Sequence, residues 1–183
     1  MRSFWHIWQE AISPEVCDQI ESMPRVPLTK GQVGTKETNN NIRKSEIAGF
    51  PYNSDESVAL NRLIEPFITM ANRENFGFRL NNFYEFQYTE YNERNEGFYG
   101  WHQDTQWLRD TESQRKLSVT IQLSDDDYEG GDFEFHKDLA QPSDIRRRGT
   151  VIVFPSFFYH QVTPVTKGIR KALVGWYEGE CFA

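Results

Sequence analysis

Residues 84–104 read YEFQYTEYNERNEGFYGWHQD, and they decide how the rest of the chain is interpreted. The alternating residues at the start predict a strand, the polar NERNEG segment predicts a turn, and FYGWH predicts a second short strand. Side chains two residues apart on a strand point to the same face, so His102 and Asp104 should converge as two ligands of one metal ion. A third ligand must come from elsewhere in the chain.

The bulk properties of the chain predict a single soluble domain. It has 183 residues, a net charge of −7 and 15% aromatic residues, which suits one aromatic-rich core spanning residues 1–183. The acidic balance argues against a protein that binds nucleic acid mainly by electrostatics. Because there is no basic-then-apolar leader and no apolar run of about 20 residues, we expect a cytoplasmic protein without a membrane segment.

The first part of the chain, about 13–75, is predicted to be a helical support. Ser13-Pro14-Glu15 has the residue types that begin a helix, and residues 54–75 have the spacing of a longer helix. Pro66 falls inside that second helix, where it predicts a bend or a break. Residues 27–45 are mostly polar, and they are interpreted either as a lid over a site or as a mobile loop.

From Phe76 onward the pattern changes to short β-rich runs, at 78–91, 116–124, 132–136, 149–156 and 170–179. No helical pattern separates these runs, so the sheet should be mainly antiparallel. The sequence therefore predicts an α+β fold in which a double-stranded β-helix (jelly roll), about 76–180, is buttressed by the N-terminal helices.

Arg146-Arg147-Arg148 is interpreted as a solvated turn, with an acidic partner as the alternative.

The segment 154–176, FPSFFYHQVTPVTKGIRKALVGW, offers a third metal ligand and a group that binds anions. His160 would complete a set of two histidines and one carboxylate, which leaves open positions on a non-haem Fe(II), although these ligand types also suit zinc. Arg170 can hold a carboxylate through two hydrogen bonds, such as the far end of a dicarboxylate whose 2-oxo acid end chelates iron. The alternative for His102 and Asp104 is a hydrogen-bonded pair without a metal. The alternative for Arg170 is an ordinary surface arginine.

The chain resembles the Fe(II)/2-oxoglutarate-dependent dioxygenases of the prolyl 4-hydroxylase type, and among them the small microbial PKHD-type hydroxylases. The resemblance covers about residues 76–178. It is carried by FQYTEY (86–91), FYGWHQD (98–104), KLSVTIQLSDDDYEGGDFEF (116–135) and HQVTPVTKGIRKAL (160–173).

The resemblance implies roles for individual residues. His102, Asp104 and His160 would be the iron ligands, and Arg170 would pair with the C5 carboxylate of 2-oxoglutarate. The hydroxyl group of Tyr91 would be a second donor to that carboxylate. Gln122 occupies a strand position where some relatives present another tyrosine that binds the co-substrate. Trp176 is either a wall of the pocket or a core aromatic residue.

The activity implied is oxidative decarboxylation of 2-oxoglutarate to succinate and CO₂, coupled to hydroxylation of a C–H bond. It requires Fe(II), 2-oxoglutarate and O₂, with ascorbate as a supporting reductant. A peptide or protein substrate with proline as the target is the first expectation, its ring packed against Tyr99, Trp101 or Trp107. Another amino acid side chain, a small molecule and a non-catalytic metal-binding jelly roll are the alternatives. Nucleic acid is not favoured as a substrate, and the oligomeric state stays open.

Overall fold

The computed structural model describes residues 3–32, 39–105, 107, 112–136 and 145–181, and for residues 82 and 83 only the backbone. The middle of the predicted lid, residues 33–38, therefore lies outside the described residues. Among the described helices, none is both long enough and apolar enough to cross a membrane.

Two helices begin where the sequence predicts them. Helix α1 (Pro14–Ser22) is capped by the Ser13 hydroxyl, which accepts a hydrogen bond from a backbone N–H in the first turn. Helix α2 (Asp55–Ala71) has the equivalent cap at Ser54, followed by two acidic residues that favour the positive end of the helix dipole. Both helices bury apolar side chains on one face.

The predicted break at Pro66 is wrong, because α2 continues through this residue and ends at Ala71. A short π-helical segment, Asn72–Phe76, follows directly. Pro66 lies on the exposed side of the helix, so the carbonyl group that loses its amide partner there can bond to water instead. An exposed proline at this position is thus compatible with a continuous helix.

The described strands form two main sheets in which every pairing is antiparallel. The larger sheet has the order β1 (His6–Trp8), β10 (Val151–Pro155), β7 (Ser113–Gln122), β13 (Ile169–Glu180), β5 (Leu80–Asn92), β4 (Glu46–Phe50) and β2 (Thr29–Lys30). The smaller sheet has the order β3 (Arg43–Lys44), β6 (Phe98–His102), β11 (His160–Val162) and β9 (Phe133–Phe135). The strands β8 (Glu129–Gly130) and β12 (Val165–Lys167) pair separately.

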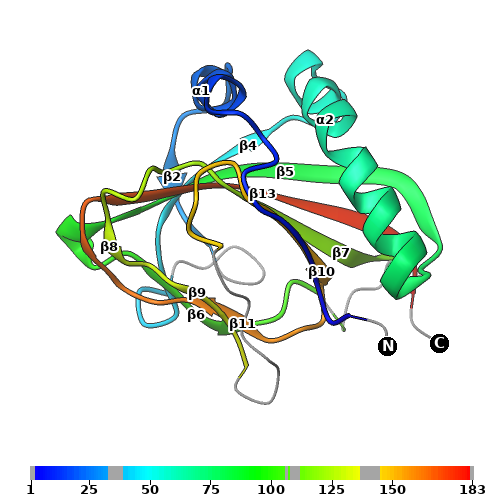
Figure 1. Cartoon of the computed structure of the whole chain (residues 1–183). Coiled ribbons are helices and arrows are strands. Elements are labelled where there is room, and N and C mark those ends of the chain that lie inside the picture. Colours follow the sequence, from blue (N-terminus) through cyan, green and yellow to red (C-terminus); the bar gives the residue numbers. More distant parts are fainter. Residues whose placement is uncertain (1–2, 33–38, 106, 108–111, 137–144, 182–183) are drawn as a thin grey trace.

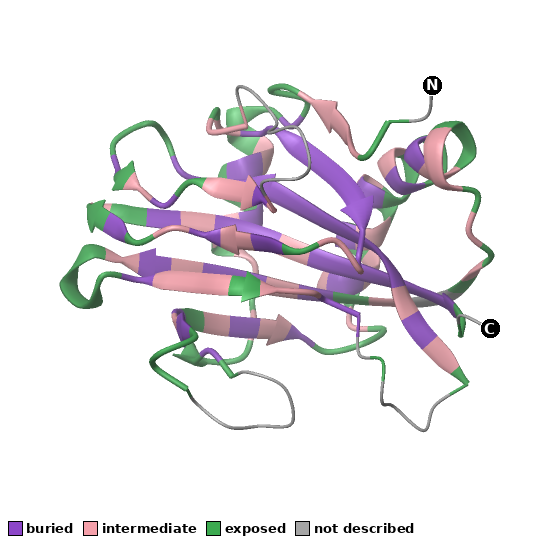
Figure 2. Ribbon diagram, turned by 90° about the horizontal axis from the view of Figure 1, so that it is seen from below, coloured by how far each residue is buried: buried purple, intermediate pink, exposed green. Residues whose placement is uncertain are grey.

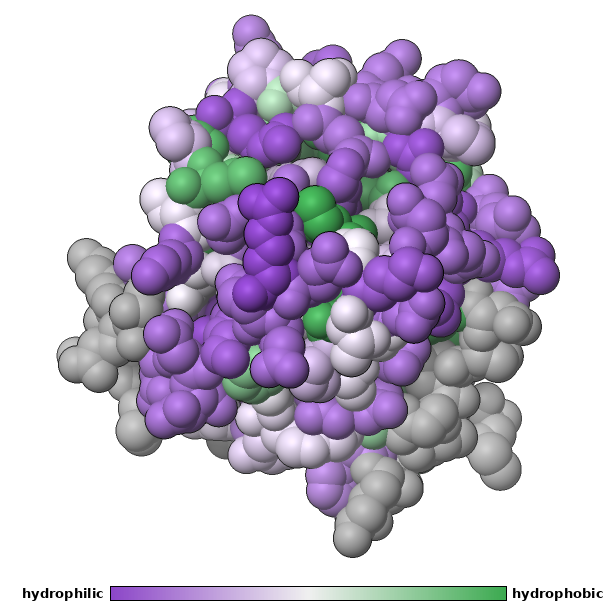
Figure 3. Space-filling view, turned by 90° about the vertical axis from the view of Figure 1, so that its left-hand side faces the viewer, coloured by the Kyte–Doolittle hydropathy of each residue, from purple (hydrophilic) through white to green (hydrophobic). Residues whose placement is uncertain are grey.

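Figure 1 shows α1 and α2 on the outer face of the larger sheet, with β6, β9 and β11 of the smaller sheet facing its other side. Buried residues are concentrated on the central strands (Figure 2). The end of the molecule that carries β8 presents mainly hydrophilic residues (Figure 3). These two facing antiparallel sheets, covered on one side by helices, are consistent with the predicted jelly roll.

The central strands carry two different faces. On β7, Leu117, Val119 and Ile121 belong to the main hydrophobic core with residues of α1 and α2. Side chains alternate along a strand, so the residues between them, Ser118 and Thr120, point to the space between the sheets. Strand β13 repeats this arrangement. The burial of one apolar face against the helices therefore fixes which polar residues line the interior.

The N-terminal region is more than a helical support, which corrects the prediction for residues 13–75. Strand β4 pairs with β5, and β3 pairs with β6 of the smaller sheet. Among the strands after Phe76, β8, β11 and β12 were not predicted, because two or three residues are too few to show a periodic pattern.

The arginines at 146–148 lie in a turn, as the sequence predicts, but their side chains are not merely solvated. Each pairs with a carboxylate of this chain: Arg146 with Asp132 at 2.6 Å, Arg147 with Glu10 at 3.0 Å, and Arg148 with Asp18 at 2.7 Å and Glu21 at 2.8 Å. The last of these connects the loop before β10 to helix α1.

Candidate metal centre and co-substrate pocket

Two histidines face each other across the smaller sheet. His102, the last residue of β6, is the cross-strand partner of His160, the first residue of β11. The Nδ1 atom of His102 lies 2.8 Å from the carbonyl oxygen of Gly100, and that of His160 lies 2.9 Å from the carbonyl oxygen of Phe158. A carbonyl can only accept, so each Nδ1 carries a proton and, in a neutral imidazole, Nε2 keeps the lone pair that can bind a metal.

Asp104 supplies the third donor group. Its side-chain oxygens lie 3.6 Å from Nε2 of His102 and 3.6 Å from Nε2 of His160. One donor atom from each of the three residues lies within 4.8 Å of the others. This set of two nitrogen donors and one oxygen donor fits a single divalent transition metal and leaves positions for other ligands.

Asp104 is not aimed by strand alternation, as the sequence suggested, because β6 ends two residues earlier. Its backbone N–H instead donates to the carbonyl oxygen of Ser156 at 2.8 Å. Its carboxylate accepts a hydrogen bond of 2.7 Å from the hydroxyl group of Ser118, a buried residue of β7. Two segments that are distant in sequence therefore orient this carboxylate.

The electrostatics of the site favour the protonation states that bind a metal. Burial, and then the neighbouring His160, lower the pKa of His102 to about 3, which keeps its imidazole neutral. Burial alone would raise the pKa of Asp104. The two imidazoles, Arg115 and the Ser118 hydroxyl outweigh that effect, so the pKa of Asp104 is lowered and the group is a carboxylate.

The three donors open into a cavity with about 460 Å³ of empty space. Arg170, Tyr91 and Trp176 also line it, so the interpretation of Trp176 as a wall of the pocket holds. The indole Nε1 of Trp176 is buried and has no hydrogen-bond partner among the described residues. The guanidinium of Arg115 lies 3.8 Å from the centre of its ring. A residue that lines the cavity therefore carries a buried donor without a partner among the described residues.

Of the three aromatic residues suggested for substrate packing, only Tyr99 lines this cavity. A shift in register between β6 and β11 places its ring on the same face as His102, and the two rings stack with centroids 3.4 Å apart. Burial raises the pKa of Tyr99 to about 12, so its phenol is neutral. Trp101 and Trp107 do not line the cavity, and their exposed fractions are 44% and 51%.

Arg170 points into the protein rather than into solvent. Only 5% of the residue is exposed, and its cross-strand partner on β5 is Tyr91, whose ring centre lies 5.5 Å from the guanidinium carbon. No carboxylate lies within ion-pair distance of Arg170 in the described part of the chain. Burying a cation without a counter-charge costs free energy, so an anionic ligand in the cavity would stabilise this side chain.

Gln122 lies apart from the metal ligands. It lines a second, neighbouring pocket and donates a hydrogen bond of 3.1 Å to the hydroxyl of Tyr128. Sequence reasoning missed both Tyr128 and Ser118 as site residues. Ser118 had a usable signal, since Ser118, Thr120 and Gln122 are polar at alternate positions of an otherwise apolar strand. Tyr128 had none, because its loop position carries no periodicity.

Comparison with known proteins identifies the family. Residues 86–178 match the model of the 2OG-Fe(II) oxygenase superfamily. The chain belongs to the 2OG-Fe(II) oxygenase superfamily. The matched region contains the three candidate metal ligands, Arg170 and Gln122, and it ends two residues after Trp176.

Relatives of this oxygenase in sequence are PKHD-type hydroxylases. The one from Synechococcus sp. (strain CC9902) is 38% identical over 86 residues, covering 44% of this chain and 36% of that protein. The one from Idiomarina loihiensis is 33% identical over 82 residues, covering 44% of this chain and 37% of that protein. The matched region thus spans little more than a third of the length of these relatives.

Solved structures show a similar fold. A prolyl-4-hydroxylase from Pseudomonas putida superposes with a TM-score of 0.71 at 20% identity, covering 97% of this chain and 94% of that one. A prolyl hydroxylase from Trichoplax adhaerens, in complex with a hypoxia inducible factor peptide fragment, superposes with a TM-score of 0.73 at 17% identity. The match covers 96% of this chain and 83% of that one. At these identities the likeness concerns the fold.

Proposed function

We propose that this member of the 2OG-Fe(II) oxygenase superfamily is a dioxygenase that uses Fe(II), 2-oxoglutarate and O₂ to hydroxylate a C–H bond. His102, Asp104 and His160 would hold the iron, which supplies the O₂ activation when bound. The donor set supports this assignment, because both imidazoles donate from Nδ1 and turn Nε2 toward Asp104, and the lowered pKa of Asp104 makes it a carboxylate.

The observation that carries the proposal is the buried guanidinium of Arg170, which has no ion-pair partner among the described residues and lies in the same cavity as the three donors. A purely structural metal site needs no such group. A dicarboxylate that chelates the metal with its 2-oxo acid end needs a cation for its other end, and a guanidinium can hold that carboxylate through two hydrogen bonds. Arg170 therefore favours an oxygenase over a structural metal module.

The remaining residues of the cavity orient and shield the reacting groups. The backbone carbonyls that accept from each Nδ1 fix both imidazole rings, and Ser118 fixes the carboxylate of Asp104. Tyr99 stacks on His102 and Trp176 lines the same cavity, so both aromatic rings would exclude water from part of the candidate metal site. We keep the jelly roll as part of this proposal, and the ends of the segment 27–45 belong to it, because Thr29–Lys30 and Arg43–Lys44 are strands of its two sheets.

For the substrate we propose a peptidyl proline. The fold resembles prolyl hydroxylases, one of which is seen with a peptide fragment, and Tyr99 places an aromatic ring beside His102. A proline ring packs well against such a surface. Another amino acid side chain or a small molecule is the second candidate, because a cavity with about 460 Å³ of empty space can also hold such a molecule.

The activity is tested by incubating the protein with Fe(II), ascorbate, O₂ and 2-oxoglutarate and measuring succinate. We expect slow production of succinate without a prime substrate and none above background for Asp104→Ala. A protein that binds Zn²⁺ tightly but neither binds nor consumes 2-oxoglutarate would instead be the non-catalytic metal-binding module.

The substrate is tested separately with peptide libraries and small-molecule extracts. Products are identified by mass spectrometry as species heavier by one oxygen atom, formed by the wild type and not by Asp104→Ala. Hydroxylation of proline-containing peptides supports the proposal, and products found only among small molecules or at other residues favour the second candidate.

A further inference from the structure

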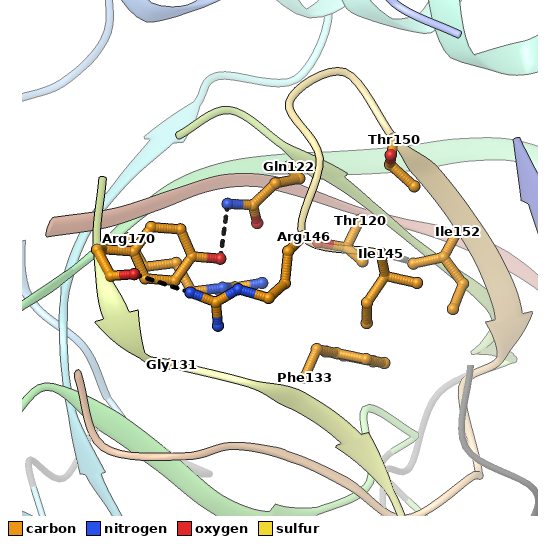
Figure 4. Close-up of a pocket in the computed structure, with 10 residues that line it drawn as sticks. Thr120, Gln122, Gly131, Phe133, Ile145, Arg146, Thr150, Ile152 and Arg170 are labelled. Atoms are coloured by element: carbon orange, nitrogen blue, oxygen red, sulfur yellow. Dashed lines mark hydrogen bonds between the residues drawn. The ribbon is translucent and has the colours of Figure 1, made fainter. Parts of the chain in front are cut away.

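A second pocket lies beside the metal cavity, with about 300 Å³ of empty space. Figure 4 shows the side chains that line it. The two spaces share Arg170, Thr120 and Phe133, so they are neighbours on either side of one guanidinium. The second pocket adds polar groups of Gln122 and Tyr128, while Ile145 and Ile152 give it an apolar side.

The hydroxyl group of Tyr128 has an unused hydrogen-bonding capacity. Tyr128 is only 3% exposed, and its oxygen accepts a hydrogen bond of 3.1 Å from Nε2 of Gln122. A phenol oxygen that accepts in this way still has its own proton to donate. Within the described residues nothing accepts that proton, and a buried donor without a partner costs free energy.

The ring of Tyr128 is held in place by Arg146, which lies in the turn before β10. The guanidinium carbon of Arg146 lies 4.2 Å from the ring centre, and Arg146 donates to the backbone carbonyls of Tyr128 and Gly130 at 2.9 Å and 2.8 Å. The charge of Arg146 is balanced by Asp132. Arg146 therefore fixes the loop, whereas Arg170 keeps its charge available for a ligand.

Gly131 shows that Tyr128 and Arg170 meet at one place. A Cβ atom added to Gly131 would lie 3.0 Å from Cδ of Arg170 and 3.2 Å from Cε2 of Tyr128. The two side chains therefore pass the same point, and their polar ends enter the same pocket. A phenol donor and a guanidinium placed together in this way match the two oxygens of one carboxylate.

We propose that Tyr128 donates its hydroxyl proton to the distal carboxylate of 2-oxoglutarate, beside Arg170, and that Gln122 is the positioning residue that turns this hydroxyl toward the ligand. The proposal rests on the proposed function and deepens it. Tyr91 lines the metal cavity and not the second pocket. In this proposal the second donor to the carboxylate is Tyr128, whereas the sequence predicts Tyr91.

The test measures equilibrium binding of 2-oxoglutarate to the Mn²⁺-loaded full chain without turnover, by isothermal titration calorimetry. Tyr128→Phe removes one hydrogen bond to a charged group, so it should weaken the binding of 2-oxoglutarate about tenfold or more. The second ligand is 2-oxopentanoate, which has the same chain length but lacks the distal carboxylate. Its binding should be the same in both proteins. Equal weakening of both ligands, or no weakening of either, would overturn the proposal.

Further variants separate this proposal from the proposed function. Gln122→Leu keeps the tyrosine but removes the hydrogen bond that orients its hydroxyl. It should therefore weaken the binding of 2-oxoglutarate by a smaller factor than Tyr128→Phe does and leave the binding of 2-oxopentanoate unchanged. Tyr52→Phe, which changes an exposed tyrosine, is the matched control. If the wild type shows no metal-dependent binding of 2-oxoglutarate, the proposed function fails and this proposal with it. If Arg170→Ala weakens binding and Tyr128→Phe does not, only the role of Tyr128 fails.

Discussion

His102 and His160 are held in the same way from opposite strands. Each imidazole donates from Nδ1 to the backbone carbonyl two residues earlier in the chain, Gly100 for one and Phe158 for the other. Their ring centres are 4.1 Å apart, and both Nε2 atoms face Asp104. Because the direct pairing of β6 and β11 fixes this arrangement, the two nitrogen donors of the proposed metal site are positioned before any metal binds.

Ser118→Ala should weaken metal binding. The substitution removes the hydrogen bond to the carboxylate of Asp104 from a buried position, and outer partners of this kind are typically worth about 10–100-fold in metal affinity. We expect at least a tenfold weaker affinity for Mn²⁺, measured by competition with a coloured chelator. The matched variant is Ser156→Ala, whose backbone carbonyl still accepts from Asp104. A smaller loss is expected there, and equal affinities in all three proteins would contradict the role of Ser118.

Arg170→Ala should raise the KM for 2-oxoglutarate by one to two orders of magnitude, because a charged hydrogen-bonded contact worth about 1.5–3 kcal/mol is lost. Arg170→Lys keeps the charge but not the two-point hydrogen bonding, so its KM for 2-oxoglutarate should lie between those of the wild type and Arg170→Ala. Steady-state succinate formation gives the values, with Arg79→Ala, a change at an exposed arginine, as the control. An unchanged KM would remove Arg170 from the anchoring role.

Gly131→Ala should disturb both stability and co-substrate binding. Gly131 has a φ of +64°, which an alanine adopts only with strain of about 1–3 kcal/mol, and its Cβ would press on Arg170 and Tyr128. We expect a lower free energy of unfolding in urea and weaker 2-oxoglutarate binding. Gly49→Ala is the control, because a Cβ there meets nothing within 4 Å. The account is contradicted if both variants bind 2-oxoglutarate like the wild type.

The two cysteines should differ in reactivity. Cys17 is fully buried, and burial raises the pKa of its thiol, so less of the reactive thiolate is present at about pH 8. Cys181 is exposed, and neither residue is in a disulfide. Titration with an aromatic disulfide reagent should modify one thiol quickly in the folded protein and both after unfolding. Two fast thiols in the folded protein, or none in the unfolded protein without reductant, would contradict this description.

Much of the framework could be predicted from the sequence because its signals are local. The caps at Ser13 and Ser54 and the alternating pattern of β5 depend on neighbouring residues, and they appear where expected. His160 and Arg170 were predicted from their residue types and from the resemblance, because no local pattern connects them to His102. The structure brings all of these side chains to one cavity.

The remaining features depend on contacts between distant segments. Asp104 is aimed by Ser156 and Ser118, not by the strand that precedes it. Tyr99 reaches the face of His102 only through a register shift that is a property of two paired strands. Tyr128 approaches Arg170 because Gly131 has no side chain. No pattern within one segment specifies such relationships, so sequence reasoning missed them or gave the wrong cause.

The central claim is that one metal ion binds to both imidazoles and the carboxylate. Anomalous diffraction from crystals of the full chain grown with Mn²⁺ or, without oxygen, Fe(II) tests it most directly. The account predicts one strong peak at bonding distance from Nε2 of His102, Nε2 of His160 and a carboxylate oxygen of Asp104. A metal held by other residues, with these three side chains unbound, would contradict it.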